Sequence, residues 1–158
     1  MRLKSHLAVA FMVGATVSGI SIYQYAQPTQ LQLLVLFFVM LGGVAPDIDA
    51  RLNGFRDVPF KKRIMLSHRG ITHHVAVPFL IAIAGLFCHG LEMTAVLSFA
   101  VGTATHIVAD MFSPLGVPYG IKYQDRIRLP VYKTGGFSEF VAVIVVVAIV
   151  LGIEYWLS

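Results

Sequence analysis

Residues 140–153 read FVAVIVVVAIVLGI and form an apolar run that decides the fold class of this chain. Extended to Leu157, the run has the length of about 17–25 residues that an α-helix needs to cross a bilayer. Four more apolar stretches precede it, namely Leu7–Ala26, Leu31–Ala45, Ile71–His89 and Met93–Ala109. The first and third are long enough to span, and the other two become so if they include the carboxylates at their ends. The sequence predicts an all-α polytopic membrane protein with about five transmembrane helices.

The composition supports a lipid environment. Of the 158 residues, 57% are hydrophobic and 13% are charged, and the mean hydropathy is +0.78. Soluble domains are usually about 45–50% apolar and about 25% charged, so a soluble protein is excluded. The length suits a single membrane-embedded domain over residues 1–158. The single cysteine, Cys88, excludes a disulfide framework and a cysteine-based zinc site.

The positions of the basic residues predict the topology. All twelve Lys and Arg residues precede the first stretch, separate the second from the third, or separate the fourth from the fifth. In a five-span chain these segments share one side, which the positive-inside rule assigns to the cytoplasm. We expect a multi-pass protein of the bacterial inner membrane with a cytoplasmic N-terminus and an external C-terminus. The basic run at residues 61–63 then contacts anionic lipids, and no nucleic-acid partner is expected. The basic N-terminus also resembles a signal peptide, but no soluble domain follows it.

Histidine and aspartate residues gather on the same side as the positive charges. Each of the five predicted helices brings a potential metal ligand to this side, whereas His89 falls on the opposite one. Any one of these residues could simply lie at a solvated helix end. Chance does not explain why all five predicted helices place a histidine or a carboxylate on the same side. The candidate metal ligands are His6, Asp47, Asp49, His68, His73, His106 and Asp110, with Glu139 as a further possibility.

The spacing of these residues indicates how they could bind an ion. His106 and Asp110 are four residues apart and share one face of a helix, so both can reach the same ion. Asp47 and Asp49 follow the second apolar stretch and could clamp one cation or bridge two. Either His73 or His74 could serve as the ligand in the third segment, and we favour His73.

The segment around Gly70 also carries groups suited to a phosphate. Thr72 is expected to cap the third helix, with the first backbone amides of that helix directed toward the site. Arg69 is placed to clamp a phosphate through two hydrogen bonds. We therefore assign a catalytic role to Arg69 as the phosphate clamp. Asp49 is assigned a catalytic role as a ligand of the metal.

The mixture of ligands favours zinc, with manganese or iron as alternatives, because calcium and magnesium prefer oxygen ligands alone. A tetrahedral site needs four ligands and the sequence offers seven candidates. We therefore expect one or two divalent ions. Two ions suit the hydrolysis of a phosphoester, and a site at headgroup level suits a lipid-like substrate. Two alternatives stay open: a metal sensor or transporter, and a non-enzymatic membrane protein with a structural metal. The oligomeric state is not determined by the sequence.

Three sequence motifs resemble those of a known family. They are PDID at 46–49, HRGITH at 68–73, and His106 with Asp110 followed by SPLGV at 113–117. Together with an early histidine, His6, they are similar to the YdjM-type, LexA-regulated inner-membrane metal-dependent hydrolases. This resemblance covers roughly Ser5 to Glu139 and implies a membrane-bound hydrolase that binds a divalent metal. The order of the residues also resembles, more remotely, zinc-dependent phospholipases C.

Overall fold

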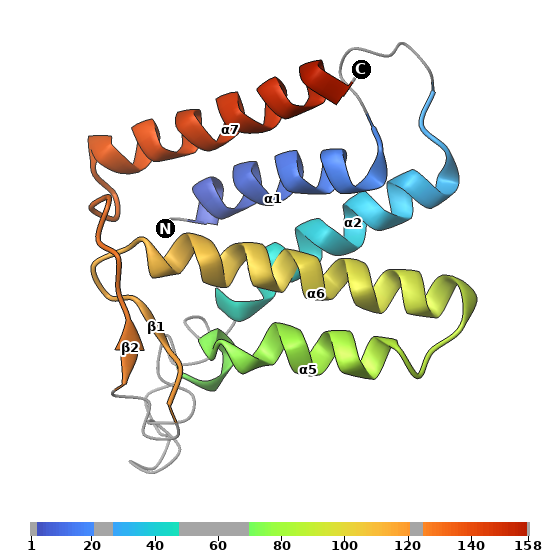
Figure 1. Ribbon diagram of the computed structural model, residues 1–158, viewed down its shortest axis with the longest axis horizontal. Helices are drawn as coiled ribbons and strands as arrows, with labels where there is room; N and C mark the ends of the chain where they lie inside the picture. Colours follow the sequence, from blue (N-terminus) through green and yellow to red (C-terminus); the bar gives the residue numbers. More distant parts are fainter. Residues whose placement is uncertain (1–2, 21–26, 48–69, 121–124, 158) are drawn as a thin grey trace.

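A computed structural model of the chain describes residues 3–20, 27–47, 70–120 and 125–157, and it has five α-helices in this part (Figure 1). The described helices lie side by side, each running in the opposite direction to the one before it in the chain, and the two termini lie at opposite ends of the bundle. This architecture confirms the prediction of an all-α polytopic membrane protein. The helices are α1 (Leu3–Ser18), α2 (Gln30–Val44), α5 (Ala76–Gly85), α6 (Gly90–Met111) and α7 (Phe137–Leu157).

Short elements gather at one end of the bundle, where α1, α5 and α7 begin and where α2 and α6 end. The described basic residues Lys4, Arg126, Arg128 and Lys133 belong to elements at this end, which we call the basic end. Two 3₁₀ turns lie here, η1 (Ala45–Asp47) after α2 and η2 (Ile71–His73) before α5. Two strands, β1 (Val117–Pro118) and β2 (Arg126–Ile127), form an antiparallel ribbon between α6 and α7.

Three helical segments have the length and composition of membrane spans: Gln30–Asp47, Gly90–Met111 and Phe137–Trp156. The second and fourth apolar stretches are therefore longer as helices than their apolar cores suggested. The first and third stretches differ in the other direction, because α1 ends at Ser18 after 16 residues and α5 has only 10 residues. Ten residues rise about 15 Å, which is half of the hydrocarbon thickness of a bilayer. The expectation of a full-length helix was wrong here, since η2 and an extended His74 occupy the first residues of the stretch.

The most extensive contact between two of the described helices joins α2 to α6 and depends on glycine. A Cβ atom on Gly102 would lie 2.0 Å from the carbonyl oxygen of Val39, and one on Gly42 would lie 2.1 Å from that of Phe99. Small residues at such crossings let helix backbones approach closely in membranes. The outer surface carries exposed apolar side chains such as Phe79, Phe87 and Trp156, as expected for helices that face lipid.

Candidate metal centre

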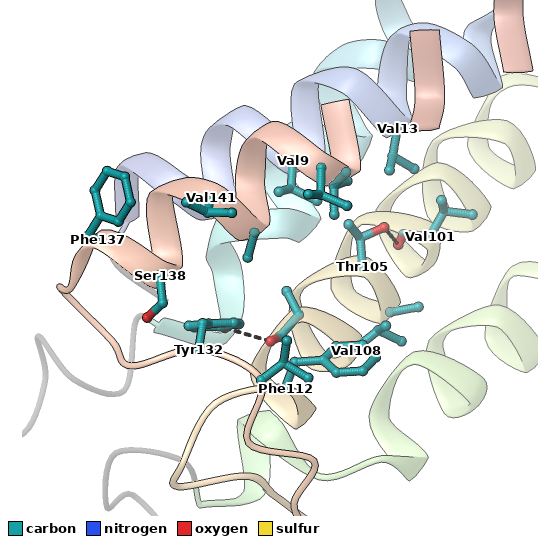
Figure 2. Close-up of a pocket in the computed structure, with 16 residues that line it drawn as sticks. Val9, Val13, Val101, Thr105, Val108, Phe112, Tyr132, Phe137, Ser138 and Val141 are labelled. Carbon is teal, nitrogen blue, oxygen red and sulfur yellow. Dashed lines mark hydrogen bonds between the residues drawn. The ribbon is translucent and has the colours of Figure 1, made fainter. Parts of the chain in front are cut away.

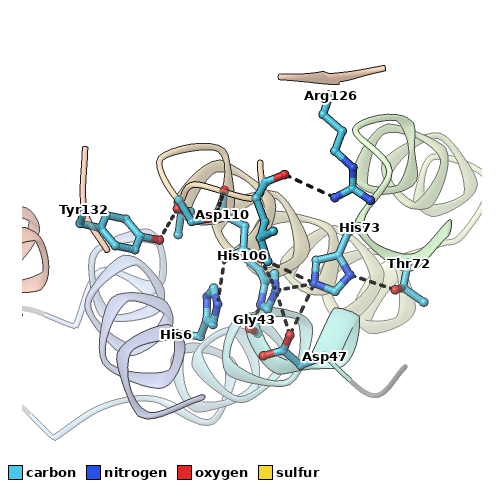
Figure 3. Close-up of polar contacts among 12 residues, drawn as sticks. His6, Gly43, Asp47, Thr72, His73, His106, Asp110, Arg126 and Tyr132 are labelled. Carbon is cyan, nitrogen blue, oxygen red and sulfur yellow. Dashed lines mark hydrogen bonds and ion pairs between the residues drawn. The ribbon is translucent and has the colours of Figure 1, made fainter. Parts of the chain in front are cut away.

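Four side chains direct one nitrogen or oxygen atom each toward a common point at the basic end (Figure 3). Nε2 of His73 lies 3.2 Å from Nε2 of His106 and 3.4 Å from Oδ1 of Asp47. Nε2 of His106 lies 3.6 Å from the same Asp47 oxygen. Oδ2 of Asp110 lies 3.7 Å from Nε2 of His73 and 3.9 Å from Nε2 of His106. We call these four residues the His₂Asp₂ cluster.

The spacing of these atoms suits a bound metal ion better than direct contacts. Charge-assisted hydrogen bonds have lengths of about 2.7–2.9 Å, and the histidine–aspartate distances here exceed that range. Zinc binds nitrogen and oxygen at about 2.0–2.2 Å, so the edges of a tetrahedral site measure about 3.3–3.6 Å. The observed distances of 3.2–3.9 Å bracket these edges. The residues present therefore fit a divalent ion held by both histidines together with a carboxylate.

Hydrogen bonds behind the two histidines orient their rings. Nδ1 of His106 lies 2.7 Å from the carbonyl oxygen of Gly43, which can only accept, so this nitrogen carries the proton. In the neutral ring, Nε2 then presents its lone pair to the cluster. Nδ1 of His73 lies 3.1 Å from the hydroxyl oxygen of Thr72. Metal-binding histidines in proteins are held in this way by partners on their outer nitrogen.

His6 adds a third imidazole beside the cluster. Its ring stacks on that of His106, with the centroids 3.7 Å apart, and its Nε2 lies 3.5 Å from Oδ1 of Asp110. The side chain is buried, and among the described residues neither ring nitrogen has a hydrogen-bond partner. Asp110 thus directs one carboxylate oxygen to the His₂Asp₂ cluster and the other to His6. A carboxylate in this position can bridge two sites.

Burial differs among the cluster residues. His73, His106 and Asp110 are almost fully buried, whereas the Asp47 side chain is 19% exposed. Water and small polar molecules can therefore reach the cluster on the side of Asp47. Two overlapping sets of three residues have ligand atoms within 4.8 Å of one another: His6 with Asp47 and His106, and His73 with His106 and Asp110.

The fold explains how three segments meet at the cluster. Asp47 ends the 3₁₀ turn that continues α2, and His106 and Asp110 occupy the last turns of α6, the helix in glycine contact with α2. The third segment is held by the ribbon, because the amide of Val75 donates to the carbonyl oxygen of Pro118 in β1.

The SPLGV motif after α6 forms the turn that makes this docking possible. Gly116 has a φ of +60°, and a Cβ atom there would lie 2.3 Å from the carbonyl oxygen of Ile127. The buried hydroxyl of Ser113 donates to the carbonyl oxygen of Asp110, which closes the end of α6. The motif therefore supports the cluster through the backbone rather than through ligands of its own.

The structure brings together His6, Asp47, His73, His106 and Asp110 of the predicted ligands. In the third segment it places His73 in the cluster, whereas Nδ1 of His74 accepts a hydrogen bond from the amide of Ala76. Glu139 is buried away from these ligand sets, and its Oε2 accepts a hydrogen bond from the amide of Gly135. The predicted ligands Asp49 and His68 and the predicted phosphate clamp Arg69 lie outside the described residues.

The expectation that Thr72 caps the third helix is wrong. Thr72 lies in η2, and α5 begins only at Ala76 with no side-chain cap from residue 75. The amides of Val75 and Val77 donate to the carbonyl oxygens of Pro118 and His74, and that of Ala76 donates to His74. Because these first amides already have acceptors, they are not available to an oxyanion. Thr72 instead supports His73.

Sequence reasoning missed two polar groups. The carbonyl of Gly43 supports His106, and no sequence signal marks a backbone acceptor of this kind. Glu154 lies buried near the far end of α7, where its Oε1 lies 2.9 Å from the Thr16 hydroxyl of α1. A carboxylate inside an apolar run was a visible signal, because such residues are rare within membrane helices.

Comparison with known proteins identifies the family of the chain. A search of curated proteins and a search of solved structures each returned no match. The family model described as YdjM inner membrane protein matches residues 1–157, which is essentially the whole chain. The chain therefore belongs to the YdjM inner membrane protein family.

Proposed function

We propose that this inner-membrane protein is a metal-dependent hydrolase that acts on a phosphoester, most simply one carried by a lipid. The observation that carries the proposal is the convergence of imidazole nitrogens and carboxylate oxygens from α6, η1 and η2 at distances of 3.2–3.9 Å. A divalent ion bound there would polarise a phosphoryl oxygen and lower the pKa of a water ligand. Zinc suits the two imidazoles and two carboxylates best, and manganese or iron are alternatives.

The residues of the chain have separable roles in this proposal. His73 and His106 hold the ion through nitrogens whose orientation is fixed by Thr72 and Gly43. Asp110 is shared between the cluster and His6, so His6 and Asp110 supply part of a second cation site. Asp49 and His68 are the proposed remaining ligands of that site, and Arg69 is the proposed phosphate clamp.

A structural metal is the second candidate, and one observation favours it. Structural zinc sites have four protein ligands, whereas catalytic sites have three and keep one position open. The His₂Asp₂ cluster offers four atoms, which describes a closed site. The exposure of Asp47 favours the catalytic alternative, because this carboxylate lies where a substrate oxygen could replace it.

Elemental analysis of the purified full-length protein, combined with an assay on lipid phosphoesters, tests the proposal. We expect stoichiometric metal in the wild type and metal-dependent release of the headgroup or phosphate. Asp49→Asn should remain folded and inserted but lose most activity, because the amide lacks the charge that binds and bridges cations. Arg69→Lys should have a milder defect, since the charge remains without the planar fork.

Asp47→Ala separates the two candidates. If the metal is catalytic, this variant should remain folded and retain part of its metal through the other three ligands. If the metal is structural, the variant should lose both metal and thermal stability. A wild-type protein that binds no metal, and whose melting temperature does not rise with added zinc or manganese, would contradict both.

A further inference from the structure

A cavity of about 900 Å³ lies on the side of α6 that faces away from α2 (Figure 2). It forms because α7 packs mainly on α1, which leaves an open groove between α7 and α6 with α1 as its floor. Its walls on α6 and α7 belong to the candidate membrane spans Gly90–Met111 and Phe137–Trp156. The wall residues include Val9 and Val13 of α1, Val101 and Val108 of α6, and Val141 and Val145 of α7.

The lining of the groove demands an apolar occupant. Three hydroxyl groups line it, and each is engaged within the chain. Thr105 donates to the carbonyl oxygen of Val101, Tyr132 donates to that of Ala109, and Ser138 accepts from the amide of Lys133. The remaining lining side chains are apolar. A polar or charged molecule in the groove would lose its hydration without gaining partners there.

The length of the groove suits an acyl chain of one leaflet. Along α6 the lining extends from Val101 to Phe112, about 16 Å at the helical rise, which is close to half of the ~30 Å hydrocarbon core. An acyl chain that lies along the groove therefore reaches from the basic end to the middle of the bilayer.

The groove ends next to the metal centre and next to positive charge. Tyr132 closes its basic end and donates to the carbonyl oxygen of Ala109, the residue before the cluster ligand Asp110. Lys133 follows Tyr132 in the chain and is exposed, as is Arg128. Cationic side chains at the membrane surface attract anionic headgroups. An acyl chain in the groove therefore brings the phosphate of its lipid to the end of the bundle that holds the cluster.

From the lining, the length and the charge at its end, we infer that the groove between α6 and α7 binds an acyl chain of an anionic phospholipid. The inference rests on the proposed function only where it makes this lipid the substrate, because binding in the groove needs no hydrolysis. It sharpens the substrate class from any phosphoester to a membrane phospholipid that enters sideways between α6 and α7.

Photo-crosslinking tests the inference. The full-length protein is placed in vesicles of phosphatidylethanolamine and phosphatidylglycerol that contain traces of phosphatidylglycerol with a diazirine on one acyl chain. After illumination, the labelled peptides are mapped by mass spectrometry. Ala142→Trp places a large side chain in the groove, and Ile144→Trp is the matched control, because Ile144 is exposed on α7 and does not line the groove.

We expect labels concentrated on the groove faces of α6 and α7, lost in Ala142→Trp and retained in Ile144→Trp, with the same metal content in both variants. Labels spread equally over α5 and the outer face of α7 would overturn the inference and leave the metal proposal intact. Groove labelling in Ala142→Trp that equals that of the wild type would overturn it as well. Groove labelling without any headgroup release would uphold the lipid site and contradict the proposed function.

Discussion

The two sides of α6 are packed in opposite ways. On one side, glycines bring α6 into backbone contact with α2, and the His₂Asp₂ cluster lies at the end of that contact. On the other side, α7 stands away from α6 and leaves the apolar groove. Ligand atoms must keep their spacing to within tenths of an ångström, which close backbone contact provides. A site for a hydrocarbon chain needs free volume instead, so one helix serves a rigid site and an open one.

The largest effect is expected from a substitution that disrupts the glycine contact between α2 and α6. In Gly102→Val the new Cβ atom would meet the carbonyl oxygen of Val39 at 2.0 Å, so α2 and α6 must separate. We expect a loss of about 3 kcal/mol or more in stability, together with loss of bound metal. Gly152→Val in α7 is the control, because no atom lies within 4 Å of its Cβ position. Thermal melting in detergent and metal analysis measure both, and equal stability of the two variants would contradict the prediction.

Removal of a ligand tests the cluster without disturbing the glycine contact. Zinc at about 100 times its dissociation constant should add about 2.7 kcal/mol to the stability of the wild type. His106→Ala should abolish this gain, because His106 belongs to both sets of three potential ligands. His89→Ala, at the start of α6 and the opposite end of the bundle, should keep it. A zinc-dependent rise in melting temperature that persists in His106→Ala would exclude His106 as a ligand.

A smaller effect is expected from the support behind a ligand. Thr72→Val removes the hydroxyl next to Nδ1 of His73 and keeps a similar shape. We expect zinc affinity to fall by about 10–100-fold while the fold is retained. Thr94→Val is the matched control, since that hydroxyl bonds within α6 far from the cluster. Competition with a fluorescent chelator measures both affinities, and identical values would show that Thr72 does not orient His73.

The smallest effect is expected from a substitution in the contact between α1 and α7. Thr16→Val removes the contact between Thr16 and the buried Glu154 that links α1 to α7. Such bonds in membrane proteins contribute about 0.6 kcal/mol on average, so the melting temperature should fall slightly and metal content should not change. Ser18→Ala removes a bond within α1 and serves as the control. Loss of metal in Thr16→Val would mean that the two sides of α6 are not independent.

The sequence predicted the helical membrane class and five of the residues that meet at the cluster. Hydropathy reports burial in lipid directly, and the spacing of His106 and Asp110 follows from helix geometry alone. The expectation that Thr72 caps the third helix was wrong, because residues 71–73 form a 3₁₀ turn and α5 begins only at Ala76, whose amide donates to Nδ1 of His74. Local signals could not show this, since the ribbon that holds Val75 comes from more than forty residues further along the chain.

By itself, the sequence determined that this is an all-α membrane protein and that the candidate metal ligands His6, Asp47, His73, His106 and Asp110 share one end of the bundle with the described basic residues. These properties depend on hydropathy and on residues close in the chain. Only the tertiary structure decided that His73 joins the cluster while His74 does not, that Gly43 orients His106, and that α7 leaves a groove beside α6. The physical reason is that these features depend on distances between helices, which are set by glycine contacts and side-chain volumes that meet only in the folded bundle.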